Sequence, residues 1–240
     1  MQMLIEFRAD GLCIPINYSH IVQGIIYNKL RSIPGLGTFL HDTGFKNDEK
    51  AFRLFTFSKL DGHYSIKNKM ITFDDKVRLE IRSPQVLLIK ILSESFEKYG
   101  ITFGNRTFVI TDIYVSDFTV EESDIDAVMK TPICVHSTDS LTGFTTYYTP
   151  EDEEFYSCIN KNFKNKYEAY FGIRPDEDIT IIPSRVSVKD RFVTSIKGIY
   201  ISGWHGRYHI SGKRKYLDFL YNTGLGEKNS QGFGMFDIEK

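Results

Sequence analysis

The order of periodic segments in the first half of the chain constrains its fold more than any other feature. Apolar residues recur at helical spacing from residue 18 to about 33 and from 84 to 99, where Pro84 stands at a permitted helix start. Alternation of apolar and polar residues predicts strands at 2–8, 52–60, about 64–73, 76–83 and 106–115. The expected order is therefore strand, helix, two or more strands, helix and strand.

The second half has a similar but less clear order of elements. Its clearest element is a helix over 151–170, with Phe155, Ile159, Phe163 and Tyr167 on one face. The other expected elements are strands near 131–137, 143–149, 178–188 and 191–204, a helix near 213–221, and a short strand at 233–238. No internal sequence repeat is visible, so the likeness of the two halves rests on element order.

Both halves follow the βαββαβ order of the ferredoxin-like fold, which RNA-recognition folds share with many unrelated proteins. We therefore predict an α+β chain of two ferredoxin-like (RRM-like) domains in tandem, with antiparallel sheets and the helices on one face of each sheet. The polar stretch at 121–126 is a plausible boundary. The expected domains are 1–122 and 123–240.

Charge is distributed unevenly along a chain that is almost neutral overall, with 30 Lys and Arg against 31 Asp and Glu. The total argues against a nucleic-acid partner, because affinity for a phosphate backbone comes mainly from Lys and Arg. Residues 121–178, however, carry 5 basic and 13 acidic side chains, and residues 185–240 carry 10 and 5. We therefore expect a polyanion along one face and an acidic surface elsewhere.

The chain lacks the signatures of several other protein classes. No stretch approaches the roughly 18 uncharged apolar residues of a membrane helix, and the first ten residues do not look like a signal peptide, so a cytoplasmic protein without membrane contact is expected. Cys13, Cys134 and Cys158 are widely spaced and odd in number, and no CxxC or HxxxH pairing is present. We expect them to be reduced, buried side chains. No metal and no cofactor are expected.

The most distinctive segment is GLGEKNSQGFGM at residues 224–235. Its glycines and side-chain donors are Gly224, Gly226, Gly232, Gly234, Lys228, Asn229 and Ser230. Such a composition is typical of a loop whose backbone approaches a polyanion closely. The segment fits neither the P-loop nor the dinucleotide-binding pattern, so nucleotide-dependent chemistry is disfavoured. From the pattern alone, the alternative is a tight turn ahead of a terminal strand.

Several blocks together resemble a known family. GLGEKNSQGFGM resembles a C-terminal glycine-rich signature, and the resemblance extends through Gly203, Trp204 and His205. It continues near the N-terminus in PINYSH (15–20), QGIIY (23–27), LH (40–41) and LFTFS (54–58), in the expected order and with fitting intervals. The chain is similar in these blocks to the Cas6 family of CRISPR-associated endoribonucleases. These are members of the RAMP superfamily that cut the CRISPR precursor transcript within its repeats.

The resemblance implies a metal-independent ribonuclease. The 2′-OH beside the scissile phosphate attacks in line and leaves 2′,3′-cyclic phosphate and 5′-OH ends. This chemistry needs a base, an acid and positive charge at the phosphate. His41, Tyr27 and a nearby cation match the family positions that carry these roles. The cation is Arg53, which stands where a Lys is common, or Lys50; Arg clamps a phosphate but does not readily exchange a proton.

Each catalytic candidate also has a structural explanation. His41 lies in a glycine-flanked polar segment and is equally typical of an exposed loop histidine, and His20 near the start of the first helix is the second candidate. Tyr27 falls on the apolar face of that helix, as a core tyrosine would, and its reference pKa near 10 suits a proton donor or phosphate ligand better than a base. Lys50 is equally typical of a solvated charge on a loop.

A second group of candidates combines aromatic and basic side chains upstream of the glycine-rich segment. Its members are Trp204, His205, Arg207, Lys213 and Arg214. Stacking on unpaired bases, with Arg and Lys on phosphates, is a common way to hold RNA, so we expect these residues and the seven of the glycine-rich segment to bind it. A core tryptophan explains Trp204 about equally well, and a solvated first turn of a helix explains Lys213 and Arg214.

Three hypotheses for the function follow. The first is an endoribonuclease that makes guide RNAs from the CRISPR precursor transcript, with His41 as the principal acid/base group. The second is a non-catalytic subunit of an interference complex that binds repeat RNA. The third, a protein scaffold, leaves the glycine-rich segment and the basic C-terminal segment unexplained. The expected partner is CRISPR repeat RNA; other complex subunits and a homodimer are left open.

Overall fold

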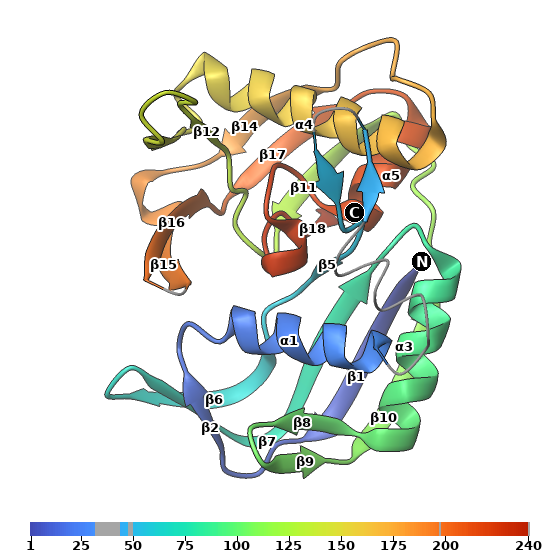
Figure 1. The fold of residues 1–240 in the computed structure, drawn as a ribbon, viewed down its shortest axis with the longest axis vertical. Helices are drawn as coiled ribbons and strands as arrows, with labels where there is room; N and C mark the ends of the chain where they lie inside the picture. The colour runs from blue at the N-terminus through green and yellow to red at the C-terminus, as the bar shows by residue number, and fades with distance from the viewer. Residues whose placement is uncertain (32–43, 48–49, 197, 240) are drawn as a thin grey trace.

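The chain folds into two halves stacked along the long axis of the molecule (Figure 1). The structure is a computed structural model that describes residues 1–31, 44–47, 50–196 and 198–239. Each half has an antiparallel sheet and a hydrophobic core of its own. Among the described residues, no helix is both long and apolar enough to cross a membrane.

The N-terminal half has the βαββαβ order. Its elements are β1 (Gln2–Arg8), α1 (Ser19–Leu30), β6 (Asp61–Lys67), β7 (Met70–Arg82), α3 (Val86–Tyr99) and β10 (Ile110–Ser116). The strand order is β10-β1-β7-β2, where β2 is Leu12–Pro15, and β6 and the short β5 (Thr56–Phe57) also pair with β7. This half also contains two small hairpins. One pairs β3 (Phe45–Lys46) with β4 (Ala51–Phe52), and the other pairs β8 (Ile101–Phe103) with β9 (Arg106–Phe108). Every second side chain of β1 points toward the helices, so Met3, Ile5 and Phe7 are buried in the core.

The C-terminal half repeats the order. Its elements are β11 (Asp124–Met129), α4 (Glu153–Phe171), β14 (Thr180–Arg185), β17 (Arg207–Ser211), α5 (Arg214–Thr223) and β18 (Phe236–Glu239). The strand order β14-β17-β11-β18 is the ferredoxin-like order. Two hairpins are added, β12 (His136–Thr138) with β13 (Thr145–Tyr147) and β15 (Arg191–Ile196) with β16 (Ile199–Trp204). The short helices η2 (Val188–Asp190) and η3 (Asn229–Gln231) lie in loops. The predicted tandem ferredoxin-like fold is confirmed.

The prediction for the first strand of the second half was wrong. That strand is β11, within and just after the stretch assigned to a boundary, whereas 131–137 and 143–149 contribute only the small β12–β13 hairpin. Asp124 and Asp126 alternate with buried Ile125 and Ala127, and both carboxylates face His209 on the neighbouring strand, at 2.9 and 3.1 Å. The charges therefore mark the exposed face of a strand.

Other predicted elements differ in detail. The segment 52–60 is broken into short pieces, 191–204 is a hairpin, and the strand at 207–211 was missed. The turn between β6 and β7 lies at Asn68 and Lys69, whose φ angles of 52° and 60° are those of a tight hairpin turn, and not near 74–75. Cys13 is exposed on β2, so its predicted burial was wrong; Cys134 is buried and Cys158 half-buried.

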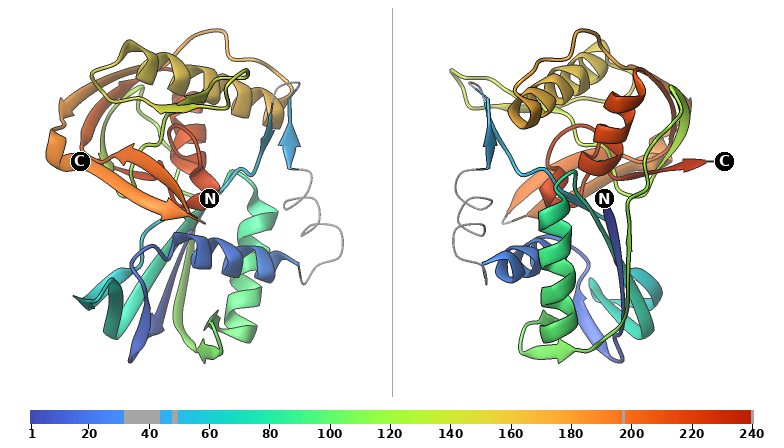
Figure 2. Two further views of the ribbon diagram at one scale, coloured as in Figure 1. Left: turned by 60° about the vertical axis from the view of Figure 1, so that its left-hand side comes forward. Right: turned by 90° about the vertical axis from the view of Figure 1, so that its right-hand side faces the viewer.

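The segment after the first helix reaches into the second half. β3 and β4 pack against α4, and both views of Figure 2 show them rising beside it. Phe52 and Leu54 are buried in the core of the C-terminal half, while Phe55 and Phe57 are buried in that of the N-terminal half. The chain therefore crosses between the cores at residues 54 and 55, and the division at residue 122 stays a prediction.

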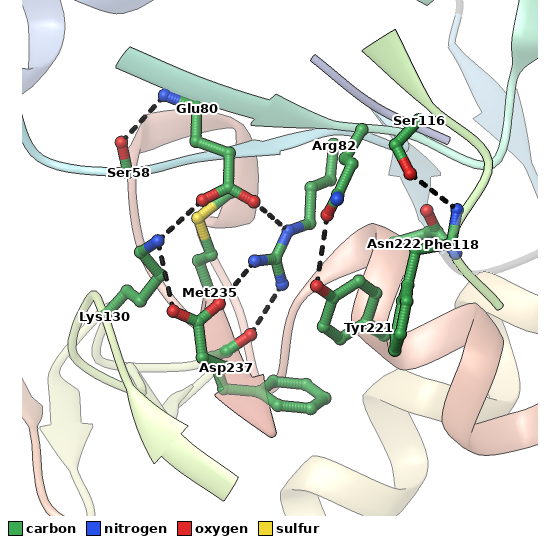
Figure 3. Close-up of polar contacts among 12 residues, drawn as sticks. Ser58, Glu80, Arg82, Ser116, Phe118, Lys130, Tyr221, Asn222, Met235 and Asp237 are labelled. Atoms are coloured by element: carbon green, nitrogen blue, oxygen red, sulfur yellow. Dashed lines mark hydrogen bonds and ion pairs between the residues drawn. The ribbon is translucent and has the colours of Figure 1, made fainter. Parts of the chain in front are cut away.

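A buried ionic network joins the two halves (Figure 3). Arg82, at the end of β7 and 1% exposed, donates from Nε to Glu80 at 2.6 Å. Its two other nitrogens donate to the carbonyl of Phe236 and to Asp237 in β18, both at 2.6 Å. Lys130, just after β11, bridges the Glu80 and Asp237 carboxylates at 2.6 and 3.1 Å. The guanidinium also lies 3.8 Å from the ring centre of Tyr221.

The network predicts a large effect of Arg82→Met on stability. Removing the guanidinium leaves the Glu80 carboxylate and the Phe236 carbonyl short of a buried donor, so the free energy of unfolding should fall by about 3–5 kcal/mol. Chemical denaturation measures it. Arg78→Met is the matched control, since Arg78 lies on the same strand and pairs with Glu6 in an exposed setting; equal losses for the two variants would contradict the prediction.

Candidate functional site

The glycine-rich segment 224–235 forms a closed loop between α5 and β18, and its η3 turn lies against α1 and β5 (Figure 1). All four of its glycines are buried and have positive φ, between 64° and 87°. A Cβ on Gly226 would lie 2.5 Å from the carbonyl oxygen of Cys134, and one on Gly234 would meet the Leu225 carbonyl more closely still. Glycine is thus required here by packing within the protein. Contact of these glycines with RNA stays a prediction.

The donors of the loop divide into two groups. Lys228 and Ser230 are half-buried at the surface, whereas Asn229 is buried. The Asn229 amide nitrogen donates to the carbonyls of Leu225 and Phe233, at 2.9 and 3.2 Å. Asn229 therefore ties together the two arms of the loop and faces the interior.

The ammonium of Lys166 fills the inside of the loop. Lys166 lies on the buried face of α4 and is 3% exposed. Its Nζ donates to the Gly224 carbonyl at 2.7 Å and the Asn229 side-chain oxygen at 3.0 Å, with the Gly226 carbonyl at 3.5 Å. Burial lowers the pKa of Lys166 from 10.5 to about 7, and the nearby Glu227 carboxylate opposes this.

Tyr27 and Arg53 meet the loop at Ser230. Tyr27 is on the last turns of α1, packs its ring against Phe55 with centres 5.7 Å apart, and makes side-chain hydrogen bonds with Ser230, Gln23 and Arg53. Burial raises the pKa of the Tyr27 hydroxyl, and the contacts with Ser230 and the Arg53 charge offset this only in part. The hydroxyl is therefore protonated at neutral pH and can donate a proton or bind a phosphate oxygen.

Lys50 is bound to a carboxylate of the loop. Its Nζ lies 2.9 Å from Glu227, whose other oxygen pairs with His136 on β12. The Glu227 side chain is only 13% exposed. Burial alone would raise its pKa, but hydrogen bonds from His136 and Lys50 outweigh this and lower the pKa of Glu227 to about 2. Glu227 is therefore ionised and holds Lys50.

A cavity of about 240 Å³ opens between these groups. The basic side chains that line it are Lys50, Arg53, His136, Lys166 and Lys228, and Glu227 is the one carboxylate among its described lining residues. Ser230 also lines it, which places Tyr27 at its edge. The excess of cations over carboxylates suits a phosphate-sized anion. Among the described residues, no group of three or more His, Cys, Asp or Glu could hold a metal ion.

The two histidine candidates are not brought into this cavity by the part of the chain that is described. His41 lies outside the described residues. His20 is exposed two turns before Tyr27 on α1, where its Nδ1 is 2.8 Å from the Asn17 carbonyl, and it lines a different cavity toward α3. A larger cavity of about 640 Å³ lies beside Arg82 and contains none of the catalytic candidates.

Trp204 and His205 lie apart from the glycine-rich loop's cavity. Trp204 is 9% exposed and packs in the core of the C-terminal half, as a core tryptophan would, and its contact with RNA stays a prediction. His205 is largely buried, with Nε2 3.0 Å from the Lys59 ammonium and Nδ1 3.3 Å from the Met129 carbonyl. Burial, together with the Lys59 charge, lowers the pKa of His205 to about 4, so it is neutral at pH 7.

The basic residues of the same group are placed on the surface. Arg207 forms an ion pair with Glu239 across the sheet. Lys213, which lies directly before α5, forms one with Asp176. Arg214 is exposed in the first turn of that helix. Their roles in binding RNA stay predictions.

Sequence reasoning missed Lys166, Glu227 and His136. A signal was present for Lys166, because it stands three residues after Phe163 and seven after Ile159, on the apolar face of a predicted helix. Glu227 lies inside the glycine-rich segment but was not assigned a role. No pattern along the chain links His136 to either residue, since the three come together only through β12, α4 and the loop.

Comparison with known proteins gives a consistent result. A family model described as CRISPR associated protein Cas6, C-terminal, matches residues 116–238. The chain is 28% identical to the CRISPR-associated endoribonuclease Cas6 1 of Methanocaldococcus jannaschii, over 98% of this chain and 91% of the relative. It is also 28% identical to the CRISPR-associated endoribonuclease Cas6 of Pyrococcus furiosus, over 100% of this chain and 89% of the relative.

The structure agrees with these matches. A solved structure described as CRISPR associated protein Cas6 superimposes with a TM-score of 0.80 at 25% identity, over 100% of this chain and 99% of the other. The family model covers just over half of the chain and includes the whole glycine-rich loop that closes on Tyr27 and Lys166. The chain belongs to the Cas6 family.

Proposed function

We propose that this protein is a metal-independent endoribonuclease that cuts CRISPR precursor RNA within its repeats. The observation that carries the proposal is the meeting of Tyr27 and Arg53 with Ser230 at a cation-lined cavity, in a chain of the Cas6 family. The names of the two curated relatives support the activity. The 2′-OH attacks the adjacent phosphorus, a 2′,3′-cyclic phosphate forms, and the 5′-oxygen leaves with a proton.

The proposed roles follow from the protonation states. Arg53 binds the phosphate and stabilises its growing charge, and Tyr27, whose pKa is raised by burial, donates a proton or binds a phosphate oxygen. A base is then still needed, and we assign that role to His41 because an imidazole titrates near neutral pH. Lys50 is the weaker candidate for the cation because Glu227 already binds it.

Residues from both proposed domains form this site. Tyr27 and Arg53 belong to residues 1–122, and Ser230 and the glycine-rich loop belong to residues 123–240. We propose that repeat RNA lies across the junction, with the scissile phosphate at the cavity. The Tyr27 hydroxyl and the Arg53 guanidinium are the groups that contact it.

A second candidate function is binding of repeat RNA without cutting. The Glu227 carboxylate favours it, because it lines the cavity and would repel the scissile phosphate from the catalytic candidates while the rest of the RNA stays bound outside the cavity. The two functions differ in one measurement. Tight binding of repeat RNA without any cyclic-phosphate product would support the second and overturn the first.

Replacing His41 should abolish most of the cutting. Because the loss of a general acid or base costs about 100-fold or more, His41→Ala should lower the single-turnover rate on repeat RNA by at least that factor. The assay is run in EDTA, and the product ends are analysed for cyclic phosphate. His63→Ala is the control, since His63 is an exposed histidine on β6. An undiminished rate for His41→Ala would exclude the assigned role.

The two cations should differ in their contributions. Arg53→Ala should lower the rate at saturating RNA by about 100-fold, as for the loss of a charge-stabilising donor, and Lys50→Ala by less than about tenfold. Lys46→Ala, an exposed change in the same segment, controls for the loss of one positive charge. If Lys50→Ala were the more damaging variant, Lys50 and not Arg53 would be the cation.

A further inference from the structure

We propose that Lys166 is a positioning residue for RNA cutting, which holds the glycine-rich loop in the conformation that keeps Ser230 against Tyr27. This inference rests on the proposed function. Lys166 does not itself bind RNA in this proposal, because the side chain is 3% exposed and its nitrogen is bonded to acceptors of the loop. It acts through the loop backbone and Asn229.

The contacts of Lys166 connect the start of the loop to its middle. One ammonium binds the Gly224 carbonyl, directly after α5, and the Asn229 side chain, which begins η3. Ser230 follows Asn229 directly, so the position of its hydroxyl depends on that anchor. Thr56 supports the far arm, since its hydroxyl donates to the Phe233 carbonyl at 3.2 Å. The loop is thereby fixed on both sides of Ser230.

Packing alone does not explain a lysine at this position. A Met of similar length would fill the same space on the apolar face of α4 without the cost of burying an amine. The Gly224 carbonyl and the Asn229 oxygen, however, would each lose their donor, and a buried acceptor left without a donor is destabilising. The need for a lysine at position 166 is explained by these two acceptors of the loop, which require a buried donor.

The surroundings of the ammonium make its burial costly. Burial disfavours the charged form of the Lys166 amine, and the Glu227 carboxylate favours it. The chain therefore places an amine whose charged form is disfavoured inside the loop that it helps to organise.

The first experiment compares Lys166→Met with Lys164→Met. Lys164 is on the same helix and makes a surface pair with Asp178 at 2.7 Å, so its replacement is the same chemical change outside the site. Lys166→Met should lower the single-turnover rate at saturating repeat RNA by about tenfold or more, with the RNA dissociation constant changed by less than about threefold. Lys164→Met should leave both unchanged.

A double-variant cycle separates positioning from a general loss of stability. If Lys166 acts through Ser230, the rate losses of Lys166→Met and Ser230→Ala should be clearly less than multiplicative in the double variant. The losses from a merely structural role would multiply. Amide hydrogen exchange should also be faster across residues 224–234 in Lys166→Met, and unchanged in Lys164→Met.

A second variant keeps the test decisive if Lys166→Met folds poorly, and a pH series tests the burial of the amine if it folds. Asn229→Ala removes the acceptor and should reproduce the rate loss. Because the folded-state pKa of Lys166 lies below its unfolded value, the unfolded chain binds more protons between about pH 7 and 10, so wild-type stability should rise with pH relative to Lys166→Met. A flat difference would mean that the Lys166 amine keeps its unfolded-state pKa, which would contradict its burial inside the loop.

The outcomes for the two proposals are distinct. If the wild-type protein does not cut repeat RNA, the proposed function fails, and the positioning role fails with it. If the wild-type protein cuts and folded Lys166→Met cuts at the same rate, only the role of Lys166 is overturned. Multiplicative losses in the double variant would have the same effect.

Discussion

The guanidinium of Arg82 lies buried where the two halves meet, and the geometry of the candidate site depends on its bonds. Tyr27 is carried by α1 of the first half, and Ser230 by the loop just before β18 of the second. Arg82 binds β18 at the Phe236 carbonyl and at Asp237 while it remains bonded to Glu80 of its own strand. The strand that follows the loop is thus held against the first sheet, and the loop with it.

The Glu227 carboxylate is a negative group among the basic side chains of the site. Glu227 binds Lys50 and His136 and faces the ammonium of Lys166 across the cavity. A phosphate that enters has to compete with this carboxylate for Lys50, whereas Arg53 lies with Tyr27 and Ser230. The cavity therefore gathers basic side chains from segments far apart in the sequence, and of the described ones only Lys228 comes from the basic C-terminal segment.

The sequence predicted an element most accurately where its residue pattern is typical of only one kind of secondary structure. Helical periodicity located α1, α3 and α4 to within a few residues, because each helix buries one apolar face. It failed at β11, where Asp124 and Asp126 resembled a linker although they alternate with buried residues. Tyr27 and Arg53 were paired from the resemblance, and the fold brings them together. Lys166 was overlooked because a lysine in a helix is usually solvated.

The sequence by itself determined the βαββαβ order of the first half and the helices of the second, since periodicity and turn residues act over a few positions along the chain. It also determined where glycine is needed, although the reason differs from the one expected: the glycines allow the loop to pack against Cys134 and Phe57. Only the tertiary structure decided what the loop encloses. Lys166, Glu227 and His136 lie on separate elements, and their energies depend on desolvation and on distances between charges, which no local pattern encodes.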